Sequence, residues 1–363
     1  MALDPQFWLH RRVLVTGHTG FSGVWLCAWL TELGAEVTGY ALPAGHSRPL
    51  FEAAGLERRM VSCLGDLRDP EWIAALVRRV RPEVVFHLAA QSLVREAVKD
   101  PVETFATNVM GTVHLLEAAR RVGSLRAVVV VTSDKVYREP AGACREQDAL
   151  GAEDPYGASK ACVEHVVAAY RRCFLTPADG VGLAAARAGN LLGGGDFAPH
   201  RLLPDVARAI QRRTPVVLRH PHHVRPWQHV LEAVHGYLLL AQALARDPRA
   251  CSESWNFGPP VRARLWTVRE LAEAALEAFG GGEIAVEEGG EDLEIPIQRL
   301  SPSKALARLG WRARLTMDER VRWTVRGYRA LLRGEGGGWL YDQIRTYAAR
   351  VAGEDREVVD AVA

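Results

Sequence analysis

The chain has 363 residues, 48% of them hydrophobic and 24% charged, and its formal net charge is +2. This length exceeds what one core usually needs, so we expect two domains or one large α/β domain with an appended lobe. The nearly balanced charge gives no electrostatic reason to expect a nucleic acid partner. The sequence contains no signal peptide pattern and no long apolar run, which argues against a membrane protein and favours a cytoplasmic one.

The six cysteines fall at irregular spacings and include no Cys-x-x-Cys pair. Neither a disulfide framework nor a zinc site is therefore indicated, and no metal is expected. Reduced thiols in a cytoplasmic protein are the simplest interpretation.

A dinucleotide site is indicated near the N-terminus. A short apolar strand at 13–15 runs into a glycine loop, Gly-His-Thr-Gly-Phe-Ser-Gly, and a helical pattern then continues to residue 33. Glycines in this context let the backbone approach a pyrophosphate held at the helix N-terminus. A tight turn without a ligand is the alternative. The candidate cofactor-binding residues of this loop are Gly17, Thr19, Gly20, Phe21 and Gly23.

The next two strands leave the choice of dinucleotide open. The second strand, at 36–40, ends without the acidic residue that favours NAD, and Arg48 is close enough in sequence to keep NADP possible. After the third strand, Asp66 could accept a hydrogen bond from the adenine amine while Leu67 packs on the ring. A plain turn is the alternative there.

A fourth strand, 84–91, ends in small residues where a cofactor backbone could lie close, so Ala89, Ala90 and Gln91 are further candidates. Asn108 begins the core-facing part of a long helix expected to run to about residue 122. A buried Asn needs partners, so this residue either holds adjacent strands or contacts the ligand.

The chemistry is expected between residues 128 and 160. The run Val128–Val131 is typical of a buried parallel strand, and Thr-Ser-Asp-Lys follows at its C-terminal end, where open α/β sheets bind ligands. Pro155 then opens a helix that puts Tyr156 and Lys160 one turn apart on the same face. The ammonium can lower the pKa of the phenol, and a Tyr that ionises more easily can act as a base on an alcohol.

The use of lysine supports this interpretation. The chain has 45 basic residues, and the only lysines among them are Lys99, Lys135, Lys160 and Lys304. A retained Lys in an Arg-rich chain suggests a site that needs a compact ammonium able to lose its proton. Two of the four fall in the stretch just described.

The pattern changes after Arg187. A sixth strand at 182–186 leads into a glycine-rich segment that we expect to cross into a second lobe. Beyond it, Arg201, Arg219 and Arg225 lie in segments flanked by prolines. Arginines from separate loops suit a diphosphate, because the guanidinium fork matches phosphate oxygens; solvated surface arginine is the alternative.

The remaining elements complete the predicted organisation. We expect a helix from 227 to 245 and a strand at 254–258 to return to the first domain, with helices at 266–279 and 303–309 in the smaller lobe. Residues 334–338 predict a flexible joint before a terminal helix. The predicted units are a dinucleotide-binding domain (1–187, with 227–260), a substrate lobe (188–226 and 261–333) and a tail (334–363). The fold class is α/β, a Rossmann-type doubly wound parallel sheet with a smaller C-terminal α/β substrate lobe.

The helices at 101–122 and 156–174 both carry apolar faces. Such faces could meet those of a symmetry mate in a four-helix bundle, giving a homodimer and possibly a tetramer. Packing within one subunit would leave the same pattern.

The chain resembles the extended short-chain dehydrogenase/reductases that modify sugar nucleotides, and most closely the CDP-glucose 4,6-dehydratases. The similarity covers roughly residues 13–333. The Asp-Lys pair at 134–135 is its most discriminating feature, because related dehydratases have Asp-Glu or similar there. The other motifs that carry it are Val15–Phe21, His87–Gln91, Thr107–Thr112, Val131–Lys135, Tyr156 with Lys160, Arg187–Asn190 and Arg225–Val230.

The resemblance implies a mechanism and its residues. Tyr156, assisted by Lys160 and Ser133, would take the proton of the glucose 4-hydroxyl as hydride leaves C4 for bound NAD. Asp134 would protonate the departing 6-hydroxyl while Lys135 takes or relays the C5 proton, and the hydride would return to C6. Asn190, Arg201 and Arg225 would hold the CDP moiety.

Two other functions remain open. A sugar-nucleotide C4 epimerase or reductase could use the same scaffold, although the Asp134 and Lys135 pair argues against it. A non-catalytic dinucleotide-sensing protein is the third hypothesis, and the intact pair of Tyr156 and Lys160 argues against that one.

Overall fold

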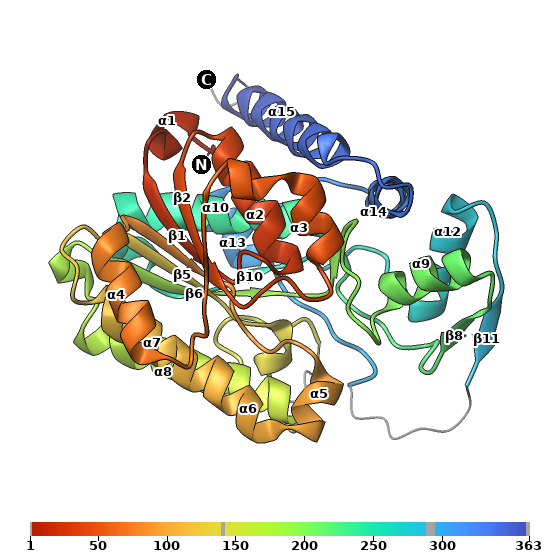
Figure 1. Cartoon of the computed structure of the whole chain (residues 1–363), viewed down its shortest axis with the longest axis horizontal. Coiled ribbons are helices and arrows are strands. Elements are labelled where there is room, and N and C mark those ends of the chain that lie inside the picture. The colour runs from red at the N-terminus through yellow and green to blue at the C-terminus, as the bar shows by residue number, and fades with distance from the viewer. Residues whose placement is uncertain (1, 139–141, 288–294, 361–363) are drawn as a thin grey trace.

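The centre of the molecule is a sheet of seven parallel strands in the order β10-β6-β5-β4-β1-β2-β3 (Figure 1). The computed structural model describes residues 2–138, 142–287 and 295–360. The predicted α/β class with a doubly wound parallel sheet is confirmed. The strands of the sheet are β1 (Arg12–Thr16), β2 (Glu36–Ala41), β3 (Val61–Leu64), β4 (Val84–His87), β5 (Ala127–Val131), β6 (Gly182–Ala188) and β10 (Ser254–Phe257).

Apolar residues on both sides of the inner strands explain why the middle of this sheet is buried, whereas the edge strand β3 is largely exposed. Val13 and Val15 point into one core and Leu14 points into the other, because successive side chains of a strand face opposite ways. Along β5, Val129 lies in the first core while Val128 and Val130 lie in the second. Continuous β-branched runs of this kind are typical of parallel strands covered on both faces.

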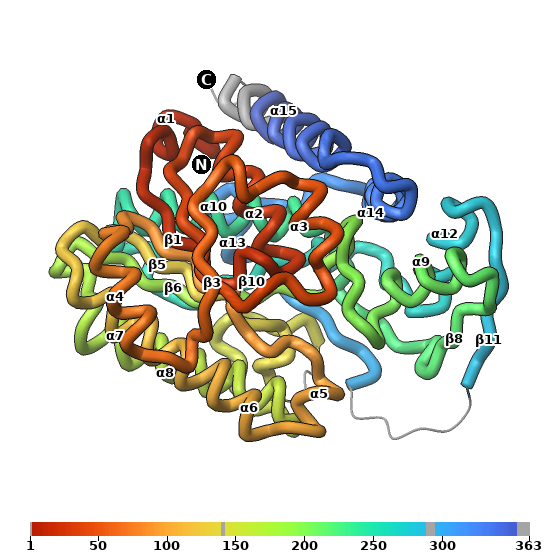
Figure 2. The backbone as a smooth tube through the Cα atoms, viewed as in Figure 1, coloured from red at the N-terminus to blue at the C-terminus, as the bar shows by residue number. Residues whose placement is uncertain are grey.

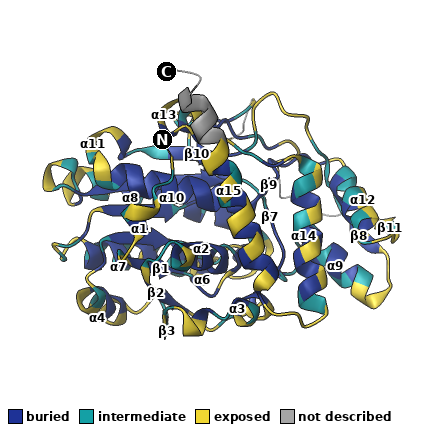
Figure 3. Cartoon of the chain, turned by 90° about the horizontal axis from the view of Figure 1, so that it is seen from above, coloured by how far each residue is buried: buried dark blue, intermediate teal, exposed yellow. Residues whose placement is uncertain are grey.

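Helices cover both faces of the sheet. The first face carries α2 (Phe21–Glu32), α3 (Arg48–Ala54) and α10 (Val230–Arg246), and α10 is buried along most of its length (Figure 3). The second face carries α4 (Pro70–Val80), α7 (Gly111–Ala119) and α8 (Pro155–Cys173), with α5 (Val94–Lys99) and α6 (Pro101–Phe105) beside α8. None of the described helices is long and apolar enough to span a bilayer.

The helix expected over 101–122 is interrupted. Between α6 and α7 the chain forms one π-helical turn, Ala106–Met110, and this turn contains Asn108. A π turn inside an α-helix is uncommon and is often found at functional sites.

The smaller lobe stands at one end of the sheet and has its own core (Figure 1). The chain enters it after β6, returns for α10 and β10, and enters it again (Figure 2). Its elements are α9 (Leu202–Arg212), β8 (Val216–Leu218), α12 (Val268–Ala278), β11 (Ile284–Val286) and the first turns of α14 (Met317–Leu332). One expected member is not there: α13 (Ser303–Leu309) packs on β10 and α10, in the core of the sheet.

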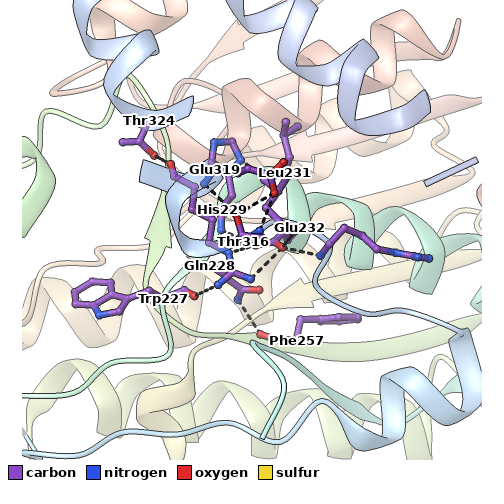
Figure 4. Close-up of polar contacts among 12 residues, drawn as sticks. Trp227, Gln228, His229, Leu231, Glu232, Phe257, Thr316, Glu319 and Thr324 are labelled. Atoms are coloured by element: carbon purple, nitrogen blue, oxygen red, sulfur yellow. Dashed lines mark hydrogen bonds and ion pairs between the residues drawn. The ribbon is translucent and has the colours of Figure 1, made fainter. Parts of the chain in front are cut away.

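A buried ion pair joins the lobe to the sheet domain. Arg320 of α14 donates to Glu232 of α10 from Nε, at 2.8 Å, and from Nη2, at 3.1 Å. Figure 4 shows Glu232 beside His229, whose backbone amide donates to the Glu232 carboxylate at 2.8 Å. Residues 228–229 form a short strand, β9, and the helix begins at Val230, so the helix expected from residue 227 starts three residues later. His229 is the N-cap, which explains the shift.

The terminal helix α15 (Gly338–Asp360) lies along α2 and α14 (Figure 1). Its Trp339 and Tyr347 rings make edge contacts with Trp25 and Trp29 of α2, at centroid distances of 5.7 and 5.8 Å. Because α2 starts at the glycine loop, α15 packs against the helix whose N-terminus is predicted to bind the dinucleotide.

Candidate active site

The glycine loop has two glycines that the fold itself requires. Gly17 has a φ of +78°, and a Cβ there would lie 2.7 Å from the backbone nitrogen of Ala89. A Cβ on Gly23 would lie 2.0 Å from the carbonyl oxygen of Gly17. Gly20 is different, because its nearest neighbour would be 3.3 Å away. It is the N-cap of α2 and no side chain caps the helix, so the amides of the first turn are suited to bind an anion.

The other predicted residues of the loop support its shape. The Thr19 hydroxyl donates to the Leu42 carbonyl at 2.9 Å. Phe21 is buried, and its ring packs against Gly193, where the chain crosses toward the lobe. These contacts connect the loop to β2 and to the crossing segment.

The predicted adenine contacts lie at the end of β3. The Asp66 carboxylate accepts from the Arg68 backbone amide at 2.9 Å and from the Arg68 guanidinium at 2.6 Å, and these hydrogen bonds lower its pKa. Leu67 is buried and packs against Gly111. Both side chains are therefore held by the protein itself, and their contact with an adenine remains a prediction.

Asn108 is buried and hydrogen-bonded within the protein, while its contact with a ligand stays a prediction. Its Oδ1 accepts from the Gln91 backbone amide at 2.8 Å, and its Nδ2 donates to the Gln91 carbonyl at 3.0 Å and to Ser159 Oγ at 2.9 Å. This amide thus joins the segment after β4 to α8. The Gln91 side chain is also engaged, with Leu93 and Thr104. Ala89 and Ala90 lie partly exposed between these groups and the glycine loop.

The segment after β5 forms a short 3₁₀ turn, η3 (Asp134–Val136), with Ser133 as its N-cap. Ser133 Oγ donates to Asp134 Oδ1 at 3.2 Å. Asp134 is buried, and its Oδ2 has no hydrogen-bond partner among the described residues. Burial raises the pKa of Asp134 from 3.8 to about 6, against the charges of Lys135 and Arg225. A carboxyl group in this state can donate a proton near neutral pH.

Tyr156 and Lys160 stand on the first turns of α8, which Asp154 caps by accepting from the Gly157 amide at 3.0 Å. The Lys160 ammonium donates to the Val131 carbonyl at 3.1 Å, and burial lowers its pKa to about 8. Burial raises the pKa of Tyr156, while a hydrogen bond with Ser133 and the charge of Arg201 oppose the rise. The expected lowering of this pKa by Lys160 is therefore wrong for this state, because desolvation outweighs the nearby charges.

The predicted phosphate ligands occupy two places. Arg201 is the N-cap residue of α9 (Leu202–Arg212). Its guanidinium pairs with Asp196 at 2.8 Å and lies 3.2 Å from Ser92 Oγ, which belongs to the segment after β4. Arg219 lies 3.3 Å from Nδ1 of the adjacent His200. Arg225 is buried and donates to the Ile295 carbonyl at 2.9 Å, and its charge acts on Asp134.

Asn190 stands just before β7 (Leu191–Leu192), and its carbonyl accepts from the Gln228 backbone amide at 3.0 Å. It is half-buried beside the segment that carries Arg225.

Several buried groups behind the site were not predicted as functional from the sequence. Glu164 pairs with Arg187 below Thr132, and His87 lies 2.6 Å from Thr16 Oγ1 and 2.8 Å from Thr112 Oγ1. One signal was present for Glu164. It lies one helical turn after Lys160, and a carboxylate at that spacing faces the same way as the ammonium.

The parallel sheet, the uncapped glycine loop and the helix bearing Tyr156 and Lys160 define an extended short-chain dehydrogenase/reductase, a Rossmann-type domain with a lobe at the carboxyl ends of its strands. Residues 14–324 match the family described as GDP-mannose 4,6 dehydratase, and the chain belongs to that family.

Two curated relatives illustrate the range of similarity. The chain is 45% identical to the CDP-glucose 4,6-dehydratase of Salmonella typhimurium, an alignment that covers 92% of this chain and 94% of that enzyme. It is 27% identical to a probable dTDP-glucose 4,6-dehydratase of Sinorhizobium fredii, covering 92% and 95%.

Solved structures of similar fold include enzymes with bound NAD. The dTDP-glucose 4,6-dehydratase of Streptomyces venezuelae, solved with NAD, has a TM-score of 0.75 and 26% identity, covering 88% of this chain and 97% of that one. A UDP-glucose 4-epimerase from Stenotrophomonas maltophila, also solved with NAD, has a TM-score of 0.77 and 26% identity, covering 89% and 99%.

Replacing Asp134 with Asn should stabilise the protein at alkaline pH and leave its stability unchanged at acid pH. The raised pKa means that folding buries an unfavourable charge above pH 6, whereas the carboxyl is almost entirely neutral in both states at about one pH unit below its ordinary pKa of 3.8. A shift of this size corresponds to roughly 3 kcal/mol as an upper bound. Urea unfolding at about pH 8 and about pH 3 measures it. Glu153→Gln, at an exposed site, should change neither value, and an equal effect of Asp134→Asn at both pH values would contradict the prediction.

Proposed function

We propose that this chain is an NAD-dependent 4,6-dehydratase that converts CDP-glucose to CDP-4-keto-6-deoxy-glucose. The observation that carries the proposal is the buried Asp134 beside Ser133, a second acid close to Tyr156. Removal of water from a sugar needs such an acid for the departing hydroxyl, whereas oxidation and re-reduction at C4 do not. The choice of CDP-glucose rests on the Salmonella relative.

The dinucleotide fits the glycine loop. The uncapped first turn of α2, which begins after Gly20, is suited to hold its pyrophosphate, with Gly17 and Gly23 giving the loop its shape. Asp66 and Leu67 would lie toward the adenosine end. NAD is proposed rather than NADP because it is the dinucleotide named with the related structures. When bound, it supplies a hydride acceptor for C4 and returns the hydride to C6.

The protein residues would then handle the protons. Tyr156 takes the proton of the 4-hydroxyl, and Ser133, already hydrogen-bonded to it, orients the phenol. The 4-ketone acidifies the C5 hydrogen, which Lys135 takes or relays. Asp134 gives its proton to the 6-hydroxyl, which leaves as water. The raised pKa of Asp134 fits this task, because more of it is protonated at neutral pH than of an ordinary aspartate.

The phosphates would be bound from the lobe. Arg201 and Arg219 lie on neighbouring segments beside His200, and a diphosphate between them would gain charge-assisted hydrogen bonds. Asn190 and Arg225 would complete the site on the side nearer Asp134. Bound substrate would also meet the contact between α9 and the loop at Ser92, where Arg201 lies 3.2 Å from Ser92 Oγ.

Incubation with CDP-, dTDP-, UDP- and GDP-glucose, read by mass spectrometry, tests the proposal. We expect a product lighter than the substrate by one water, formed fastest from the CDP sugar. A product of unchanged mass with inverted configuration at C4 would instead identify the alternative function, a C4 epimerase. Tight NAD binding without turnover of any of the four sugars would favour the dinucleotide-sensing alternative.

Substitutions at Tyr156 and Asp134 should separate oxidation at C4 from the elimination of water. Tyr156→Phe removes the base and should lower turnover by about 10² to 10⁴ fold without any burst of NADH absorbance. Asp134→Asn should permit oxidation at C4 and block elimination, so that NADH absorbance appears and persists while no dehydrated product forms. Normal dehydration by Asp134→Asn would show that another group is the acid.

We also propose a homodimer formed by the outer helices of the second face. Val102 on α6 is 78% exposed and Met110, next to α7, is 48% exposed, and large exposed apolar groups of this kind mark interfaces. A bundle with the same helices of a second copy would cover them.

Val102→Glu should therefore convert the dimer to a monomer, as measured by size-exclusion chromatography with light scattering. Val217→Glu is the matched control, because Val217 is also exposed but lies on β8 in the lobe. Equal masses for the two variants would contradict this choice of interface.

We finally propose a reducing, cytoplasmic location. The support is chemical: all six cysteines have free thiols, and two of them, Cys162 and Cys173, are exposed.

A further inference from the structure

A buried ion pair lies directly behind the catalytic residues. Arg187 of β6 donates to Glu164 of α8 through Nε and Nη2, both at 2.8 Å, and each side chain is only 3% exposed. Two hydroxyls complete the set. Thr132 donates to one carboxylate oxygen at 2.7 Å and Ser254 to the other at 2.8 Å. Each oxygen of Glu164 thus accepts two hydrogen bonds.

These contacts connect the three segments that carry the proposed catalytic residues. Thr132 directly follows β5 and precedes Ser133. The third nitrogen of Arg187, Nη1, donates at 2.7 Å to the hydroxyl of Tyr137, the residue that follows η3. Glu164 itself lies on α8, one turn after Lys160. The end of β5, the turn with Asp134 and the helix with Tyr156 are therefore all held by one charged pair.

Such a pair is held tightly. Burial disfavours a charged Glu164, but the hydrogen bonds and charge of Arg187 outweigh it and lower its pKa. A buried carboxylate with all its hydrogen bonds made is stable as an anion, while removing one partner would leave the other uncompensated. Glu164 therefore remains negatively charged throughout the working pH range.

This fixed negative charge acts on Lys160. Burial lowers the pKa of Lys160 to about 8, and the charge of Glu164 is what opposes that fall. Other titratable groups come from α8 itself and from three further elements. His87 on β4 interacts with the ammonium, while the elements packed on α8 also carry Arg187 on β6 and Asp134 and Lys135 on η3, and Tyr156 lies on the same helix. His87 is kept neutral, because burial lowers its pKa to about 3.

We propose that the buried Glu164 and Arg187 pair is the positioning element of this active site. It fixes the three catalytic segments relative to one another and keeps the Lys160 ammonium charged, so that Lys160 can stabilise the Tyr156 phenolate. Neither residue touches the substrate. The catalytic consequence rests on the proposed function, whereas the charge of Lys160 can be measured without any substrate.

The small number of lysines makes that measurement direct. Protein labelled with ¹³C at lysine Cε gives four signals, from Lys99, Lys135, Lys160 and Lys304, and a Lys160→Arg variant identifies the one that belongs to Lys160. We expect the titration midpoint of this signal to fall by at least one pH unit in Glu164→Gln. Glu164→Asp keeps the charge with a shorter reach and should give an intermediate midpoint. It keeps the proposal testable if Glu164→Gln does not fold.

Ser254→Ala is the matched control. It removes one hydrogen bond to Glu164 but leaves the charge and the ion pair, so the Lys160 midpoint should stay at the wild-type value. An unchanged midpoint in both Glu164 variants, with only a lower melting temperature, would overturn the proposal and leave Glu164 a purely structural residue.

A second readout uses the reaction. In Glu164→Gln the upper pH limit of kcat should fall together with the Lys160 midpoint, with kcat reduced and KM nearly unchanged. A shifted Lys160 midpoint in a protein that dehydrates no nucleotide sugar would support the positioning role and reject the proposed function. A shifted midpoint with an unmoved pH limit would reject the catalytic part of the inference.

Discussion

All the functional segments of this protein meet because seven strands run in the same direction. In a parallel sheet every strand ends at the same edge, and the register places Thr16 beside His87 and His87 beside Val130. The residues that follow these strands, including Gly17, Ala89 and Ser133, must therefore lie close together. A Cβ on Gly17 would lie 2.7 Å from Ala89, which shows how tightly that edge is packed. The two-sided burial of the strands is what makes this edge rigid.

Burial also sets the chemistry of the site. It raises the pKa of Asp134 and of Tyr156 and lowers that of Lys160, and in each case a nearby charge or hydrogen bond works in the opposite direction. Asp134, with a pKa of about 6, and Lys160, with a pKa of about 8, are thus held closer to the balance between their charged and neutral forms than an ordinary Asp or Lys, whereas Tyr156 stays protonated. Groups in that state can accept and release protons within one reaction cycle.

Two buried ion pairs join separate parts of the molecule. Glu232 and Arg320 join the lobe to the sheet domain, while Glu164 and Arg187 join the catalytic segments to one another. Both pairs bring together residues far apart in sequence. Because each charge is buried, losing one partner would leave the other unpaired and destabilise the folded protein. The relative positions of the segments that carry each pair are therefore strongly specified. The lobe can then bind a ligand against a site that is already formed.

Local patterns in the sequence were enough to predict the α/β class, the glycine loop before α2, and the placement of Tyr156 and Lys160 on one helical turn. Each of these depends on residues within a few positions of one another. Other features depended on distant contacts. Asn108 is hydrogen-bonded to Gln91 and Ser159, and α13 packs on the sheet instead of the lobe. His229 is the N-cap of α10, so this helix begins at Val230 and not at residue 227. The pKa of Tyr156 was predicted in the wrong direction, because spacing along a helix reveals a neighbouring charge but not how much water the fold removes. Burial is a property of the assembled chain, so only the tertiary structure could decide it.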